Sequence, residues 1–198
     1  FQDPYYFLKR QGLFAGIGLV IMVVMMFFPY SHLKRLAYPL LLLSILILTA
    51  VLIPGIGHRA GGSMRWLKFQ FFSFQPSEFA KLGLIVFLAY FLTKKEDKIR
   101  SFSFAFLPTV LLSGLVIALV AKEPDFGAAF FLTVMVFLLL FVSGARVIYI
   151  VSACLAAFPV AYYLLTTVAY RHKRLLSFIR PWEDPMGTSF QIVQSFLS

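Results

Sequence analysis

The sequence has little charge and almost no cysteine or histidine. Of its 198 residues, 13% are charged, one is cysteine and three are histidine. A single cysteine excludes a disulfide framework and a thiolate metal site. His32, His58 and His172 are too scattered along the chain to indicate a metal cluster. The sequence therefore predicts no metal ligands. It also lacks Gly/Ser linkers, charge runs and low-complexity segments, so we expect one membrane domain over residues 1–198.

The residues that fill the chain instead are apolar. Hydrophobic residues make up 61% and aromatic residues 18%, and the mean hydropathy is +0.88. An ordinary globular domain is roughly half apolar and about a quarter charged. The net charge of +10 would favour nucleic-acid binding in a soluble protein. Here the cations lie in short loops between apolar runs, which indicates contact with the lipid bilayer or with anionic lipid-linked substrates, and no nucleic-acid partner.

Six apolar runs meet or approach the roughly 20 residues that a helix needs to cross a bilayer. They are 11–28, 36–54, 77–93, 102–121, 126–143 and 147–169. Because backbone polar groups must be satisfied inside hydrocarbon, these runs predict an all-α, polytopic helical bundle.

The positive charges do not settle the orientation of this bundle. The predicted loops 29–35, 94–101 and 143–146 lie on one side and hold seven of the 18 Lys and Arg residues, and the other side holds eleven. The positive-inside rule applied to this count makes the side with eleven cations cytoplasmic. The densest short cluster, "TKKEDKIR", favours the opposite orientation, and the richer side could instead use its cations to bind an anionic ligand.

Residues 61–81, "GGSMRWLKFQFFSFQPSEFAK", lie on the cation-rich side and are unusually polar. Arg65 offers a fork of donors for phosphate, while Trp66 suits a phosphate site or an interfacial aromatic belt. A helix that starts at the proline places Glu78 in its first turn and Lys81 on the same face. The two residues could form an ion pair at the helix mouth or line a polar cavity, where charge at membrane depth is usually found.

Two further segments on this side carry carboxylates. In "AKEPDFG", 121–127, Asp125 could simply stabilise a helix start, and Lys122 could instead face the same aqueous vestibule as Lys81. In "RPWEDPMG", 180–187, Asp184 precedes a proline that biases it to an extended conformation. A rigidly held carboxylate with a raised pKa suits a general base, and a solvated acidic turn is the alternative.

Three stretches together resemble one family in order and spacing. "RWLKFQFFSFQPSEFAKL", "KEPDFGAAFFL" and "RLLSFIRPWEDPMGTSFQIVQS" resemble the SEDS family (shape, elongation, division and sporulation) of FtsW/RodA proteins over essentially the whole chain. The "PWEDPMG" wording is closer to the cell-division, FtsW-like branch than to the elongation branch. The resemblance implies a fold of roughly ten membrane helices with about six present here, so we expect an internal piece lacking the first helix and the C-terminal helices.

The resemblance also implies an activity. It implies a peptidoglycan glycosyltransferase that polymerises lipid II at the outer face of the bacterial cytoplasmic membrane during cell division, with a class B penicillin-binding protein and other divisome membrane proteins as partners. Asp184 matches the family's essential loop aspartate, the expected general base for an inverting displacement of undecaprenyl pyrophosphate. A divalent cation, Mg²⁺ or Mn²⁺, could assist as cofactor. The expected substrate-binding residues are Arg65, Trp66, Glu78, Lys81, Lys122, Asp125, Arg174, Gln191 and Gln194.

Two departures and two alternative functions remain open. The family often has Gln-Pro-Asp-Leu-Gly-Thr where this chain has residues 123–128, and Gly-Tyr-Gln where it has residues 189–191. Neither departure removes a proposed catalytic group, but both leave the substrate contacts open. A lipid II flippase or transporter is one alternative, since charged residues at membrane depth also mark transport paths. A divisome scaffold without chemistry is the other.

Overall fold

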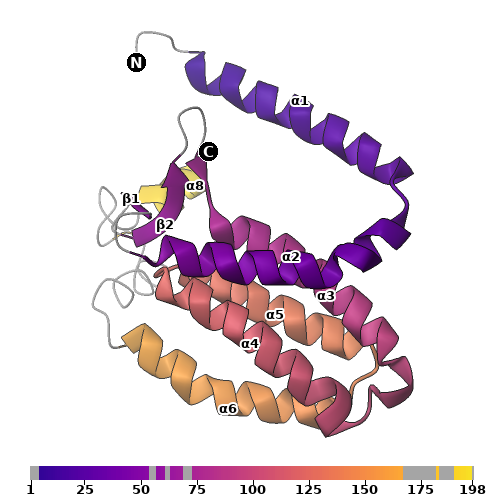
Figure 1. The fold of residues 1–198 in the computed structure, drawn as a ribbon. Coiled ribbons are helices and arrows are strands. Elements are labelled where there is room, and N and C mark those ends of the chain that lie inside the picture. Colours follow the sequence, from indigo (N-terminus) through magenta and orange to yellow (C-terminus); the bar gives the residue numbers. More distant parts are fainter. Residues whose placement is uncertain are drawn as a thin grey trace.

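The computed structural model describes residues 5–53, 57–60, 63–68, 73–166, 182 and 190–197. The helices α2 to α6 lie roughly side by side, α1 lies apart from them, and short strands gather at one end of the bundle (Figure 1). The helices are α1 (Tyr6–Phe27), α2 (Tyr30–Val51), α3 (Pro76–Lys94), α4 (Leu107–Lys122), α5 (Phe126–Val142), α6 (Val147–Thr166) and α8 (Phe190–Leu197). A 3₁₀ turn, η1 (Glu96–Lys98), and a π-helical turn, η2 (Phe102–Phe106), join α3 to α4.

The helical bundle predicted from the apolar runs is confirmed. Each of the six runs forms a helix, although α1 begins at Tyr6 rather than at residue 11. Its early start includes Lys9 and Arg10, whose long side chains can extend toward an interface while their stems stay on the helix. Among the described residues, four helical segments are long and apolar enough to cross a membrane: Leu8–Phe27, Tyr30–Val51, Pro76–Lys94 and Phe102–Lys122. The apolar helices Phe126–Val142 and Val147–Pro159 are shorter.

The core of the bundle is centred on α3. Leu84, Phe87 and Leu88 of this helix are fully buried, and Leu48 of α2 and Leu132 of α5 complete the same cluster. The contact between α2 and α3 is the most extensive in the described structure. These interior faces are mostly apolar, and their packing fixes the relative positions of α2, α3, α4 and α5.

Small residues let α2 and α3 approach closely. Gly83 of α3 faces Ser44 of α2, and a Cβ atom added to Gly83 would collide with the Ser44 Oγ and lie 3.0 Å from the Leu40 carbonyl oxygen. Small residues are enriched where membrane helices pack, because association there depends on close van der Waals contact. Gly83 therefore sets the separation of the two central helices.

The two outer helices have little or no buried surface in the described structure. No part of the apolar window of α1 is buried, and α6 contacts chiefly α5. Between α5 and α6 the chain turns at Gly144, whose φ of 86° favours glycine. The exposed apolar side chains of α1 and α6 are suited to a lipid environment.

A small antiparallel sheet between α2 and α3 was not predicted. Its strands are β1 (His58–Ala60), β2 (Ser63–Lys68) and β3 (Ser73–Phe74), in the order β1-β2-β3. The pairs Ala60–Ser63 and Leu67–Phe74 define the register. Residues 63–68 show no strict apolar–polar alternation, and in so apolar a sequence hydrophobicity does not separate a strand from an interfacial loop. The sheet satisfies backbone polar groups at the end of the bundle.

Candidate functional site

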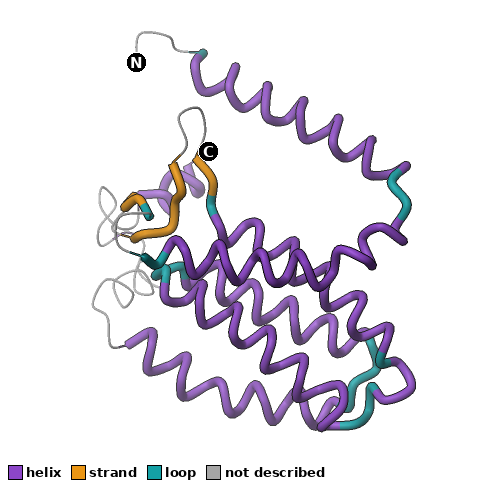
Figure 2. The backbone as a smooth tube through the Cα atoms, viewed as in Figure 1, coloured by secondary structure: helices purple, strands orange, loops and turns teal. Residues whose placement is uncertain are grey.

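Polar side chains from three separate segments meet at the end of the bundle that carries the strands. These segments are β2, the start of α3, and the turn 123–125 that joins α4 to α5 (Figure 2). Because α4 runs toward this end and α5 runs away from it, the turn between them lies beside the start of α3. The directions in which the helices run bring these residues together, although the residues are far apart in the sequence.

Asp125 is the centre of this arrangement. Its Oδ1 atom accepts a hydrogen bond from the Ala128 N–H at 3.1 Å and so caps the N-terminus of α5. Its Oδ2 atom accepts a hydrogen bond from Gln75 Nε2 at 2.9 Å and lies 3.8 Å from Arg65 Nη1. The side chain is only 11% exposed. Asp125 is therefore both a helix cap and the acceptor that links β2, α3 and α5.

Arg65 projects from β2 toward this carboxylate. Its side chain is 32% exposed, and its Nε atom is buried without a hydrogen-bond partner in the described structure. A guanidinium group has five N–H donors in a planar fork. The contact with Asp125 involves the Nη1 atom, so other N–H donors of the guanidinium group can bind a second anionic group such as a phosphate oxygen.

Glu123 is the most deeply buried charged residue of the described chain. Its exposure is 0%, and neither carboxylate oxygen has a hydrogen-bond partner among the described residues. It lies outside the span that ends at Lys122. Burial, reinforced by the negative charge of Asp125 and opposed by the positive charge of Arg65, raises the pKa of Glu123 to about 8. The side chain is therefore mostly protonated at neutral pH.

Glu78 and Lys81 form a second polar group in the first turns of α3. Lys81 Nζ lies 2.7 Å from Glu78 Oε1, and 5.3 Å from the ring centroid of Phe131 in α5. The ion pair expected from the i,i+3 spacing is present. The Glu78 side chain is 60% exposed and that of Lys81 is 24% exposed, so the pair lies on the surface of the described structure.

The other predicted site residues fall into two groups. Trp66 is half-buried in β2 opposite His58, and Lys122 is the exposed last residue of α4. Gln194 is exposed on α8; Gln191 also lies on α8, and nothing is described of its side chain. Arg174 and the predicted general base Asp184 lie outside the described residues.

Two members of the site were missed by the sequence prediction. Gln75 donates to both Asp125 Oδ2 and Ser77 Oγ, each at 2.9 Å, and Glu123 is buried beside Asp125. Gln75 directly precedes the helix-starting Pro76, in a position that is usually read only as a cap. The available signal for Glu123 was a carboxylate placed next to the apolar end of a predicted span, where charge is costly.

Comparison with known proteins finds a match to one protein family. The family model for FtsW, RodA and SpoVE, described as "Cell cycle protein", matches residues 1–198. The chain is 43% identical over 198 residues to a protein named "Probable peptidoglycan glycosyltransferase FtsW" from Geobacter sulfurreducens, covering all of this chain and 53% of that protein. The chain thus spans about half the length of such curated relatives.

Solved structures with the same fold are also known. A structure described as the structural coordination of polymerization and crosslinking by a peptidoglycan synthase complex is similar at a TM-score of 0.74 and 31% identity, covering 98% of this chain and 56% of that one. The rod shape determining protein RodA of Thermus thermophilus is similar at a TM-score of 0.63 and 30% identity, covering 80% of this chain and 51% of that one.

Proposed function

Because the chain belongs to the FtsW/RodA/SpoVE family of cell cycle proteins, we propose that it is part of a peptidoglycan glycosyltransferase that polymerises lipid II. The observation that carries the proposal is the convergence of Arg65, Gln75, Glu123 and Asp125 at one end of a membrane-spanning bundle. The 43% identity to a protein named as such a transferase supports the reaction class. That relative is named FtsW, which supports the division branch.

The proposed reaction is an inverting displacement. Asp184 removes the proton from the 4-hydroxyl of an acceptor GlcNAc, whose oxygen then attacks the anomeric carbon of the donor MurNAc. The bond from that carbon to the pyrophosphate oxygen breaks, and undecaprenyl pyrophosphate leaves with the electron pair. Negative charge develops on the pyrophosphate, so fixed cations in a partly dry site stabilise the transition state. Arg65, Lys81, Lys122 and Arg174 are the proposed cations.

The contacts of Arg65 support its part in this mechanism. Asp125 holds the guanidinium group from one side while the side chain stays one-third exposed, so its free donors can point toward a ligand. Asp125 is in turn held by Gln75 and by the Ala128 N–H. A preorganised cation of this kind loses little conformational freedom when it binds the leaving group.

The donor set of the described residues does not fit a dedicated divalent metal site. The described part of the chain contains no group of three or more His, Cys, Asp or Glu that could hold a metal ion. Both oxygens of Asp125 already have donors, and Arg65 adds a positive charge next to them. The proposed mechanism therefore has no step through a metal ion.

The proposed location is the bacterial cytoplasmic membrane, with the strand-bearing end of the bundle facing outward. The four membrane-length helices support a multi-pass arrangement. Lipid II is the proposed substrate, and a class B penicillin-binding protein within the divisome is the proposed partner. A relative of known structure belongs to a peptidoglycan synthase complex that combines polymerization with crosslinking, which supports such a partner.

Polymerisation of labelled lipid II tests the proposal. The full-length protein, purified with its penicillin-binding partner, should form glycan strands in the presence of penicillin, and Asp184→Asn should abolish them. Asp97→Asn, at an exposed carboxylate of η1 at the other end of the bundle, is the matched control and should leave polymerisation unchanged. Full polymerisation by Asp184→Asn would contradict the assignment of the base.

A lipid II transporter is the second candidate, because a buried, protonated carboxyl group such as Glu123 is also a feature of transport paths. Translocation of fluorescent lipid II across liposomes distinguishes the two. If transport requires Glu123 to release and rebind its proton, Glu123→Gln, which cannot ionise, should block translocation while polymerisation is intact. The transferase requires polymerisation by protein that translocates nothing.

A further inference from the structure

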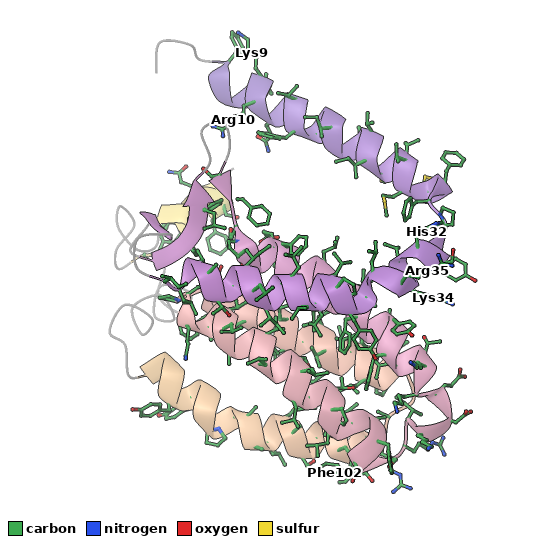
Figure 3. The ribbon with its side chains drawn as sticks, viewed as in Figure 1. Lys9, Arg10, His32, Lys34, Arg35 and Phe102 are labelled. Carbon is green, nitrogen blue, oxygen red and sulfur yellow. The ribbon has the colours of Figure 1, made fainter. Side chains whose placement is uncertain are left out.

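A cavity of about 520 Å³ lies at the end of the bundle opposite the candidate site. It is formed between the first turns of α2 and the last turns of α3, and its lining includes Tyr30, Lys34, Ile85, Ala89, Tyr90 and Lys94. Figure 3 shows Lys34 at this end, near the start of α2 and far from the strands. The cavity shares no residue with the site described above.

Two lysines mark the outer rim of this cavity. Lys34 Nζ lies 4.7 Å from the ring centroid of Tyr30, and Lys94 Nζ lies 5.7 Å from that of Tyr90. Neither ammonium group has a carboxylate within ion-pair distance among the residues that the structure describes. The aromatic rings hold both cations at the rim, where a negatively charged group between them could contact both.

Helix stability accounts for only one of the two cations. Lys94 lies in the last turn of α3, where the helix dipole favours positive charge. Lys34 is the fifth residue of α2, beyond the first turn in which the dipole acts, so the dipole gives no reason for a cation there. A ligand with negative charge at the rim would give Lys34 a partner.

The cavity continues from the lysines into an apolar groove. Its inner part is lined by Ile85, Val86 and Ala89 of α3, and Ile85 is 42% exposed. Nine residues of helix separate Lys94 from Ile85, a rise of roughly 13 Å at 1.5 Å per residue. That length is close to half of the bilayer hydrocarbon thickness of about 30 Å, and so to the depth of one leaflet.

We propose that this cavity binds one anionic phospholipid, with its phosphate between Lys34 and Lys94 and an acyl chain along the groove beside Ala89. Basic pockets between membrane helices are suited to such headgroups. Charge complementarity at the rim and apolar lining at the depth of a leaflet together select a lipid rather than a soluble anion. We place this lipid in the inner leaflet, an assignment that rests on the proposed function, which puts the opposite end of the bundle outside.

Lipid titration followed by native mass spectrometry tests the proposal. The full-length protein in a neutral detergent is titrated with dioleoyl phosphatidylglycerol, or with dioleoyl phosphatidylcholine, which has the same phosphate and chains but no net charge. We expect one phosphatidylglycerol to be retained at least tenfold more tightly than phosphatidylcholine. The double variant Lys34→Gln/Lys94→Gln should lose this preference, since each lysine near an anionic lipid contributes roughly a factor of five.

A matched control separates this site from general attraction. Lys95→Gln/Lys98→Gln removes the same charge from the same end of the bundle, but neither residue lines the cavity, so binding should be unchanged. Ala89→Phe fills the groove without changing charge and should also weaken phosphatidylglycerol binding. Glycerol phosphate, added as a soluble competitor, should not displace the lipid.

Three results would overturn the proposal: equal retention of the two lipids, equal losses in the two double variants, or displacement by glycerol phosphate. Thermal melts of all variants in the same detergent identify any that fail to fold, and Ala89→Phe then provides a variant with its lysines intact. Because lipid retention is measured without lipid II, failure of this proposal and failure of the proposed glycosyltransferase activity give different results.

Discussion

Gln75 donates a hydrogen bond from Nε2 to Oδ2 of Asp125, at 2.9 Å, across 50 residues of sequence. This contact joins the residue that precedes α3 to the residue that caps α5. Arg65 approaches the same oxygen from β2. One carboxylate thus fixes the relative positions of two helix starts and a strand, and its replacement affects both stability and the position of the proposed phosphate-binding cation.

Replacement of Asp125 should separate its capping role from its charge. Asp125→Asn keeps a side-chain oxygen that can accept from the Ala128 N–H, so most of the cap should remain. Asp125→Ala removes the cap, worth about 1 kcal/mol. It also leaves the partly buried Arg65 without its ion-pair partner and Gln75 with Ser77 Oγ as its remaining acceptor, at about 1–3 kcal/mol more. Thermal unfolding in detergent should rank wild type above Asn and Asn above Ala. Equal melting of the two variants would show that the cap contributes nothing.

Glu123 should make the stability of the protein depend on pH. Its pKa is about 8 in the folded protein and 4.5 as an ordinary carboxyl group, so the folded state binds the extra proton between these values. Stability should therefore fall as pH rises from about 4.5 to about 8, by at most about 1.4 kcal/mol per pH unit, and level off above that range.

Glu123→Gln imitates the protonated form and should remove this dependence. The variant should melt like wild type at pH 5 and above wild type at pH 9. Glu96→Gln, at an exposed position in η1, is the matched control and should retain the wild-type slope. A wild-type melting temperature that is unchanged between pH 5 and pH 9 would be inconsistent with a buried, protonated Glu123.

Gly83 should not tolerate even a methyl group. In Gly83→Ala the new Cβ would collide with Ser44 Oγ, which cannot turn away freely because it is hydrogen-bonded to the Leu40 carbonyl at 2.7 Å. We expect a loss of about 1–3 kcal/mol from overpacking. The same change at Gly114 of α4 meets nothing within 4 Å and should be neutral or slightly stabilising. Combining Gly83→Ala with Ser44→Ala should recover part of the lost stability. If stability does not recover, the contact with Ser44 Oγ is not the source of the strain.

Lys81 should matter far more to activity than to stability. Its ion pair with Glu78 lies at the surface, with Glu78 60% exposed, so Lys81→Gln should change the free energy of unfolding by less than about 1 kcal/mol. If Lys81 stabilises the departing pyrophosphate, polymerisation of lipid II should fall at least about tenfold. Lys95→Gln, at the opposite end of the bundle, should leave both unchanged. A proportional loss of stability and activity would assign Lys81 a structural role only.

The local features of this protein were determined by its sequence. Apolar runs predicted all six long helices, because a segment in lipid must satisfy its own backbone hydrogen bonds. The i,i+3 spacing predicted the contact of Glu78 with Lys81, and the position of Asp125 after a proline predicted a helix cap as one of its roles. Each of these depends on neighbours within one helical turn. The roles of Asp184 and Arg174 are still predictions, since both lie outside the described residues.

Only the tertiary structure decided which distant groups meet. The sequence placed Arg65 and Asp125 on the same side of the membrane, but their contact at 3.8 Å depends on how α3, α4 and α5 pack. The same packing buries Glu123 and brings Gln75 to Asp125. The pairing of β1, β2 and β3 likewise depends on partners that periodicity cannot identify in so apolar a chain. Local patterns fix helices and caps because those interactions lie within one turn, whereas the site depends on the angles and directions at which the helices pack.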